Sequence, residues 1–192
     1  MAYDYRLEEE PRYEIIGGKK VLMAASPKPY HNSIVLKLAV IFGSYLKIKQ
    51  NGAGIFTGID VHFPDGDIFR PDLFIIRNLK DIQRDKAIHG VPDLVVEVLS
   101  RSTSKKDFGE KKDSYEKNGV KEYWIINPED KSIQVYYLTD GKFKLDYVYQ
   151  IYSDDDLEIL EESERNAIKY DIKVSIFDDL TINVNDVFRW WV

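Results

Sequence analysis

The chain has 192 residues, of which 44% are hydrophobic and 31% are charged, and its formal net charge at pH 7 is −6. This length and composition are typical of one globular domain and exclude an intrinsically disordered chain. The sequence contains no cysteine, which excludes a disulfide scaffold, a disulfide-linked partner, a thiolate zinc site, an iron–sulfur cluster and a cysteine nucleophile.

The first half of the sequence predicts a hairpin, a long helix and three strands. Residues 13–16 and 19–23 form the hairpin, because the paired glycines Gly17 and Gly18 suit a turn with positive φ. Apolar residues then recur at helical spacing over residues 30–50, in a stripe wide enough for a well-buried helix. The predicted strands are residues 54–63, 71–77 and 92–99.

The second half predicts one more helix and a further hairpin. The helix covers residues 105–118, and Ser104 with Asp107 has capping-box spacing at its start. A strand over residues 122–127 precedes a hairpin of residues 132–138 and 142–150. We expect a loop or short helix at residues 153–164, a last strand at 172–177 and a terminal helical turn at 184–192. The central order of helix, three strands, helix and strand predicts an α/β (α+β) fold with a mixed sheet flanked by helices.

Glu97 is the carboxylate in the otherwise apolar run Leu94-Val95-Val96-Glu97-Val98-Leu99. Apolar residues occupy both the odd and the even positions of this run, which is typical of a strand buried on both faces of its sheet. A buried carboxylate is costly unless it is paired, protonated or bound to a metal ion. Glu97 therefore needs a partner, which is either a base in a structural salt bridge or a metal ion.

Asp72 opens another apolar strand, in the run Arg70-Pro71-Asp72-Leu73-Phe74. A Pro-Asp pair also commonly starts a strand for structural reasons alone, and Pro92-Asp93 repeats it. Neighbouring strands lie about 4.8 Å apart, so an aligned register would bring Asp72 and Glu97 to one divalent cation. Two carboxylates with waters and phosphate oxygens suit Mg²⁺, which rarely uses a cage made only of protein groups.

The second predicted helix carries the candidate cation. Phe108 and Tyr115 set its inward stripe, and Lys111 and Lys112 both flank that stripe. A lysine there either reaches over the sheet rim towards the carboxylates or extends along the surface into water. Spacing alone does not separate Lys111 from Lys112. His31, at the start of the first helix, is by itself typical of a cap or packing residue.

The charge is uneven along the chain. Residues 150–192 carry a net charge of −7, which leaves +1 for the first 149 residues, and residues 101–121 hold seven bases against four acids. The basic segment is either a solvated mixed-charge helix or a surface that contacts phosphate groups. The acidic start of the sequence has no apolar signal-peptide segment, and no apolar run is long enough to cross a bilayer. We therefore expect a soluble, cytoplasmic protein without a membrane partner.

Two runs of the sequence are long enough to compare with known families. They are YEIIGGKKVLMAASPKPYHNSI, and the segment from Arg70-Pro71-Asp72 through VPDLVVEVLSRSTSKKDFGEKKDSYEKNGVKEYWIINPE. Both resemble the Uma-type putative restriction endonuclease family, and the resemblance covers about residues 13–180. It implies the restriction-endonuclease-like core of the PD-(D/E)XK nuclease superfamily. We then expect a single domain over residues 1–192, with a core at about 30–128, an N-terminal hairpin at 12–24, and a C-terminal hairpin and acidic tail at 131–192.

The resemblance also implies roles for individual residues. Asp72 and Glu97 match the two acidic positions of the superfamily motif, and Leu99 stands where its lysine usually lies. In DFGEKKDSYEKNGV, the lysine of the family aligns with Lys111, whereas Lys112 falls where the family usually has an apolar residue. Glu14 and His31 match further positions typical of the family and are supporting candidates.

These observations lead to the hypothesis of a Mg²⁺-dependent endonuclease that hydrolyses phosphodiester bonds of DNA, with Mn²⁺ as a possible substitute. Asp72, Glu97 and the Val98 carbonyl would bind the metal, and Lys111 would complete the catalytic group with Asp72 and Glu97. The residues expected to contact nucleic acid are Arg101, Lys105, Lys106 and Lys112. A homodimer is expected because cutting a duplex needs two sites.

Two alternatives stay open from the sequence. The first is a catalytically inactive nuclease-fold module that binds nucleic acid or protein, which Leu99 and the acidic total favour. The second is an interaction protein that uses Trp190 and Trp191 in an oligomer interface. DNA binding without a response to Mg²⁺ or Mn²⁺ would identify the first, and an internal base paired with Glu97, without metal binding, would identify the second.

Overall fold

The computed structural model describes residues 12–23, 28–49, 52–84, 86–100 and 104–189 of the chain. These residues form a mixed α/β fold with two six-stranded mixed sheets and a two-stranded sheet. We call the first six-stranded sheet, with the order β12-β11-β10-β9-β6-β3, the core sheet, and the second, with the order β2-β1-β5-β4-β8-β7, the side sheet. Arg101, Trp190 and Trp191 lie outside the described residues.

The strands of the core sheet and the helices between them follow the predicted order of helix, three strands, helix and strand. Strands β9 and β10 run parallel, and the other neighbours in this sheet run antiparallel. The parallel pair requires a crossover, which the two helices after β9 provide. The elements are α1 (Pro29–Lys49), β3 (Gly54–Phe56), β6 (Leu73–Ile76), β9 (Leu94–Val98), α2 (Ser104–Phe108), α3 (Glu110–Asn118), β10 (Glu122–Asn127), β11 (Ser132–Thr139) and β12 (Lys142–Gln150).

The side sheet is built from the N-terminal hairpin and from short strands inserted between the strands of the core sheet. Its members are β1 (Tyr13–Ile16), β2 (Lys19–Leu22), β4 (Val61–His62), β5 (Ile68–Phe69), β7 (Gln83–Arg84) and β8 (Ile88–His89), and a 3-10 helix, η1 (Leu79–Asp81), precedes β7. β1 pairs with β2 in the predicted hairpin register and with β5 on its other side. The hairpin is therefore anchored to the segment that leads into β6.

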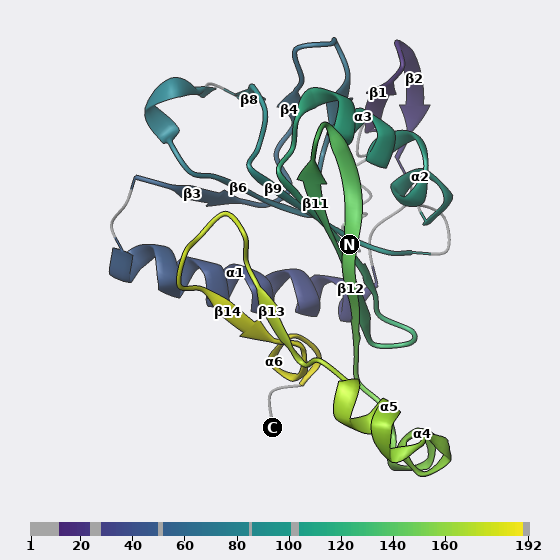
Figure 1. Cartoon of the computed structure of the whole chain (residues 1–192). Coiled ribbons are helices and arrows are strands. Elements are labelled where there is room, and N and C mark those ends of the chain that lie inside the picture. The colour runs from purple at the N-terminus through teal and green to yellow at the C-terminus, as the bar shows by residue number, and fades with distance from the viewer. Residues whose placement is uncertain (1–11, 24–27, 50–51, 85, 101–103, 190–192) are drawn as a thin grey trace, which may run out of the picture.

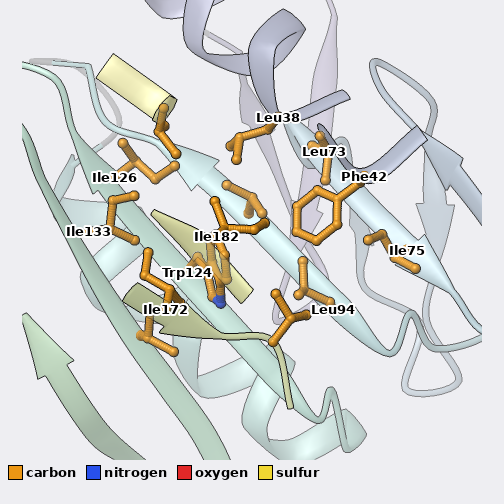
Figure 2. Packing of buried hydrophobic residues seen from close by; sticks show 14 of the residues in the cluster. Leu38, Phe42, Leu73, Ile75, Leu94, Trp124, Ile126, Ile133, Ile172 and Ile182 are labelled. Atoms are coloured by element: carbon orange, nitrogen blue, oxygen red, sulfur yellow. The ribbon is translucent and has the colours of Figure 1, made fainter. Parts of the chain in front are cut away.

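One face of the core sheet packs against α1 and the C-terminal elements. These elements are β13 (Asp171–Lys173), β14 (Thr181–Asn183) and α6 (Val184–Phe188), and Figure 1 shows them on the same side of the sheet as α1. Figure 2 shows Leu38 and Phe42 of α1 among the buried residues of this layer, which also include Leu73, Ile75, Leu94, Trp124, Ile126, Ile133, Ile172 and Ile182.

The opposite face packs against α3 and the side sheet. Phe74, Val95 and Tyr123 of the core sheet lie in one buried cluster with Tyr115 of α3 and Phe69 of the side sheet. All five residues of β9 are buried, which confirms the prediction that this strand is covered on both faces. The lone charged residue of β9, Glu97, points into the side that holds α3.

The structure departs from the sequence-based prediction in three elements. The predicted strand 54–63 is divided, because the chain turns at Gly58, whose φ is +64°, and passes from β3 of the core sheet to β4 of the side sheet. The predicted helix 105–118 is divided at Gly109, whose ψ of −107° is not helical. The predicted strand 172–177 is shorter, and its partner β14 was not predicted, because a three-residue strand carries little periodicity.

The acidic segment after β12 forms two short helices, α4 (Asp154–Ile159) and α5 (Glu162–Ala167). A capping box starts α4, in which the Ser153 hydroxyl accepts from the backbone of Asp156 and the Asp156 carboxylate accepts from the backbone of Ser153. Both helices lie at one end of the molecule, below the core sheet in Figure 1. Among the described residues, no helix combines the length and apolar character that a membrane span needs.

Candidate active site

Asp72 and Glu97 meet at one end of the core sheet. Leu73 of β6 pairs with Val96 of β9, so continuing the antiparallel register by one residue places Asp72 opposite Glu97. The backbone N–H of Val98 donates to Oδ2 of Asp72 at 2.7 Å. The strand register thus brings together the two carboxylates that the sequence singled out.

Lys111 reaches Glu97 from the first turn of α3. Its Nζ lies 3.0 Å from Oε1 of Glu97, 2.8 Å from Oε1 of Glu14 and 3.7 Å from Oδ1 of Asp107. The Lys111 side chain is only 5% exposed. One ammonium group therefore joins three carboxylates from β9, β1 and α2, and we call Glu14, Asp72, Glu97, Asp107 and Lys111 the acidic cluster.

Tyr115 is a member of the site that the sequence analysis did not single out as functional. Its hydroxyl donates to Oε1 of Glu97 at 2.7 Å, and its side chain is fully buried. The available signal was its position four residues after Lys111, because residues at that spacing share one face of a helix. Lys111 and Tyr115 together hold the same oxygen of Glu97.

Glu14 enters the site through the side sheet. β1 pairs with β5 just before Arg70, and the backbone N–H of Arg70 donates to Oε1 of Glu14 at 3.3 Å. The Glu14 side chain is 5% exposed. A residue some sixty positions before Asp72 therefore contacts the same ammonium group as Glu97, and the tertiary packing of the hairpin is what places it there.

The acidic cluster is electrostatically unbalanced. Burial raises the pKa of Glu97 well above its usual value, the Lys111 ammonium opposes this, and the carboxylates of Asp107, Asp72 and Glu14 raise it further. Burial lowers the pKa of Lys111, but Glu97, Glu14 and Asp107 outweigh it, so the net effect is a raised pKa. The raised pKa of Lys111 favours its charged form. The raised pKa of Glu97 means that its ionisation is costly among these carboxylates, and a further cation would lower that cost.

His31 contacts the other carboxylate. Its Nε2 lies 3.1 Å from Oδ2 of Asp72. Burial lowers the pKa of His31, but the hydrogen bond and the charge of Asp72, together with hydrogen bonds to Asn32 and the Val98 backbone, outweigh burial and give a raised pKa. The imidazolium form of His31 is thereby favoured beside Asp72, where the first turn of α1 meets the end of the core sheet.

The donor set fits a metal site of the kind that uses few protein ligands. Within the described ranges, no group of three or more His, Asp or Glu residues is arranged to hold a metal ion. Among the described residues, the hydrogen bonds to Asp72 use Oδ2 and those to Glu97 use Oε1. The other oxygens, Oδ1 of Asp72 and Oε2 of Glu97, are those that a cation would use. Mg²⁺ commonly binds through one or two carboxylates and keeps several waters.

The described lysines predicted to contact nucleic acid lie outside the acidic cluster. Lys105 is exposed on α2, and Nζ of Lys106 donates to the Leu22 carbonyl at 3.5 Å. Nζ of Lys112 lies 3.7 Å from the centre of the Tyr136 ring. Burial against that ring lowers the pKa of Lys112, although nearby acidic residues oppose the shift. The structure thus separates Lys111, which enters the cluster, from Lys112, which covers a tyrosine.

Two comparisons with known proteins found a match to this chain. Residues 2–171 match the sequence model of the Uma2 family, described as putative restriction endonuclease. The fold is similar to the crystal structure of a putative nuclease belonging to DUF820 from Anabaena variabilis, with a TM-score of 0.69 and 21% sequence identity, over 94% of this chain and 91% of that one. At this identity the likeness is evidence for the fold alone. No curated protein matches the chain.

Proposed function

The chain belongs to the Uma2 family of putative restriction endonucleases, and we propose that it is a Mg²⁺-dependent endonuclease that hydrolyses phosphodiester bonds of DNA. The observation that carries the proposal is the meeting of Asp72, Glu97 and Lys111 at one end of the core sheet. Two adjacent carboxylates beside a buried ammonium group suit the metal binding and charge stabilisation that phosphodiester hydrolysis requires.

The architecture supports the more specific assignment to the restriction-endonuclease-like fold. Helix α1, strands β3, β6 and β9, the helix pair α2–α3 and strand β10 follow the order of that core. The C-terminal elements share a buried cluster with α1, and the N-terminal hairpin pairs with β5. We therefore propose a single domain with a core at about residues 30–128, to which the N-terminal hairpin and the segment 131–192 are added.

In the proposed mechanism, Asp72, Glu97 and the Val98 carbonyl would hold Mg²⁺, and Mn²⁺ would replace it. When bound, this cation would polarise a phosphate oxygen and lower the pKa of the attacking water. Lys111 provides a fixed positive charge that orients the water and stabilises negative charge on the phosphate. Tyr115 fixes one oxygen of Glu97 through its 2.7 Å hydrogen bond.

The supporting residues hold the ligands in place. His31 contacts Oδ2 of Asp72 and so helps to fix the orientation of that carboxylate. Glu14 shares the Lys111 ammonium with Glu97. Lys105, Lys106 and Lys112 offer positive charge near the site for the phosphates of the DNA backbone. Two copies of the chain would cut both strands of a duplex, so the active form is proposed to be a homodimer in the cytoplasm.

One alternative function has specific support. Leu99 occupies the position at which the nuclease motif usually has lysine, and Lys111 is engaged by three carboxylates. A nuclease-fold module that binds nucleic acid or protein without cutting it would tolerate both features. Such a module would bind DNA without a response to Mg²⁺ or Mn²⁺.

Calorimetric titration with Mn²⁺ and a plasmid-cleavage assay test the proposal together. The wild type is expected to bind Mn²⁺ saturably and to cleave, whereas Glu97→Gln and Asp72→Asn lose both, with cleavage reduced by about 100-fold or more. Asp93→Asn is the matched control, because Asp93 also follows a proline before a core strand but pairs with Lys121 at 2.6 Å. Folded variants of Asp72 or Glu97 that still cleave DNA would refute the assignment.

A further inference from the structure

A cavity of about 510 Å³ opens next to the acidic cluster. His31 lines this cavity and also contacts Asp72, so one side chain joins the two features. Leu99 and Ser100, which line it too, directly follow the Glu97–Val98 end of β9. Two residues along a strand span roughly 6.6 Å, so the cavity begins about one nucleotide length from the carboxylates.

The lining of the cavity combines aromatic and apolar walls with a few polar groups. Tyr30 comes from the start of α1, Phe108 from the end of α2, and Pro128 follows β10. Phe108 is 42% exposed although it is large and apolar. Because these rings come from three different elements, the space between them suits a flat ring that is bound on more than one side.

The polar groups of the cavity have the chemistry of nucleobase recognition. Oδ1 of Asn127 accepts from the backbone N–H of Glu129 at 3.1 Å, so its NH₂ group is the part that it can offer to a ligand. Ser104 adds a hydroxyl, Lys28 adds a positive charge and Glu129 adds a carboxylate. The amide and the hydroxyl can hydrogen-bond to the edge of a base, and the apolar walls match its ring faces. The cation matches the phosphate of the nucleotide.

We propose that this cavity is a base pocket that holds one unstacked nucleobase of the strand whose phosphate lies at Asp72 and Glu97, a proposal that rests on the proposed function. A cavity of this volume falls within the range of about 300–1,000 Å³ seen for small-molecule sites. A base inside a paired duplex cannot enter it. The substrate class is therefore DNA with one unpaired nucleotide beside the cut, either a single strand or a duplex from which that base is flipped out.

The test uses 2-aminopurine deoxyribonucleoside 5′-monophosphate, whose fluorescence is quenched when its ring stacks on an aromatic side chain. Without divalent cations, the wild type is expected to quench the probe saturably, and deoxyribose 5-phosphate, which lacks a base, is expected not to displace it. Phe108→Ala should weaken binding by about tenfold or more, because base–aromatic stacking is lost. Leu145→Ala on β12, which is 49% exposed in the wild type, is the matched control and should leave binding unchanged.

A second variant keeps the test independent of Phe108. Leu99→Trp fills the cavity from its inner end and should abolish quenching by a chain that still melts cooperatively. Absence of saturable quenching by the wild type, equal binding by Phe108→Ala, or displacement of the probe by deoxyribose 5-phosphate would each overturn the base pocket. The DNA-cleavage assay tests the proposed function separately. Cleavage without probe binding rejects the pocket alone, whereas probe binding without cleavage supports the pocket and rejects hydrolysis.

Discussion

At the residue scale, Glu97 shows how one carboxylate oxygen can be held from two directions. Both Lys111 and Tyr115 bond to Oε1, at 3.0 Å and 2.7 Å, and both come from α3. Because the surroundings are buried, neither bond competes with water, and loss of either partner leaves a polar group without full compensation. The two substitutions below separate the charge of the lysine from the hydrogen bond of the tyrosine.

Lys111→Met should destabilise the protein by about 3 kcal/mol or more, because it leaves buried carboxylates without their cation. Lys112→Met is the adjacent control and removes a charge that lies over the Tyr136 ring, a contact worth about 1 kcal/mol. Urea unfolding of both variants measures the difference. Equal destabilisation by the two substitutions would contradict the central position of Lys111.

Tyr115→Phe should reduce DNA cleavage and cost about 1–3 kcal/mol of stability, because the hydroxyl that holds Glu97 is removed. Tyr123→Phe is the control, since Tyr123 is equally buried but donates to the Asp107 carbonyl at 2.9 Å. We expect both variants to lose stability and only Tyr115→Phe to lose cleavage beyond that loss. Equal cleavage rates of Tyr115→Phe and Tyr123→Phe, compared at the same folded fraction, would show that Tyr115 has only a structural role.

At the element scale, the break between α2 and α3 gives Asp107 and Lys111 separate helices. Gly109 stands at this break, and a Cβ there would lie 3.0 Å from the Lys105 carbonyl oxygen. The break also leaves Phe108 partly exposed at the end of α2 while α3 directs Lys111 and Tyr115 inwards. In a continuous helix, the helical periodicity would fix the directions of these side chains relative to one another.

Gly109→Ala should destabilise the protein by about 1 kcal/mol or more, because the added methyl group crowds a backbone carbonyl that cannot move without disturbing α2. Gly43→Ala is the opposite case. A Cβ at Gly43 meets nothing within 4 Å, and alanine in a helix interior gains about 0.5–1 kcal/mol over glycine. Thermal melts of the two variants should therefore shift in opposite directions, and a shift of the same sign would show that the α2–α3 junction can relax.

At the scale of the whole molecule, Glu122 joins the core sheet to the C-terminal segment. The residue lies on β10 and is fully buried. Its Oε2 accepts from the backbone N–H and the hydroxyl of Ser175, both at 2.7 Å, and its Oε1 accepts from Nε1 of Trp124 at 2.7 Å. This carboxylate fastens the segment after β13 to the sheet that carries the acidic cluster.

Burial raises the pKa of Glu122 from 4.5 to about 7, although its hydrogen bonds oppose the shift. The folded state then holds a proton that the unfolded state has already released, so the free energy of unfolding should fall as pH rises from about 4.5 to 7. Glu122→Gln cannot titrate and should flatten this part of the profile, at the cost of one lost acceptor. Urea unfolding at several pH values compares the two proteins, and identical slopes would exclude Glu122 as a source of the dependence. The buried Glu97 also has a raised pKa, so it adds a pH dependence of the same sign to the wild type and to Glu122→Gln.

Much of the fold and part of the site can be predicted from local patterns. The hairpin at Gly17-Gly18, the long helix α1 and the doubly buried strand β9 follow from periodicity and turn residues, because these signals depend only on neighbouring positions. The same reasoning identified Glu97 as a carboxylate in need of a partner. The two-residue strands of the side sheet, such as β4 and β8, escaped prediction, because they have no measurable alternation and exist only through their pairing.

Long-range packing decides the rest of the site. Lys111 and Lys112 are adjacent and both flank the inward stripe of the helix, so their spacing is equally compatible with the site, and the register of α3 against β9 turns only Lys111 to Glu97. Glu14 carries no local sign of a role, because its contact with Lys111 depends on the hairpin packing beside β5. Local sequence thus determines the strands and the buried carboxylate Glu97. The partners of Glu97 come from segments that are far apart in sequence. These segments come together only when folding covers the apolar faces of the core sheet.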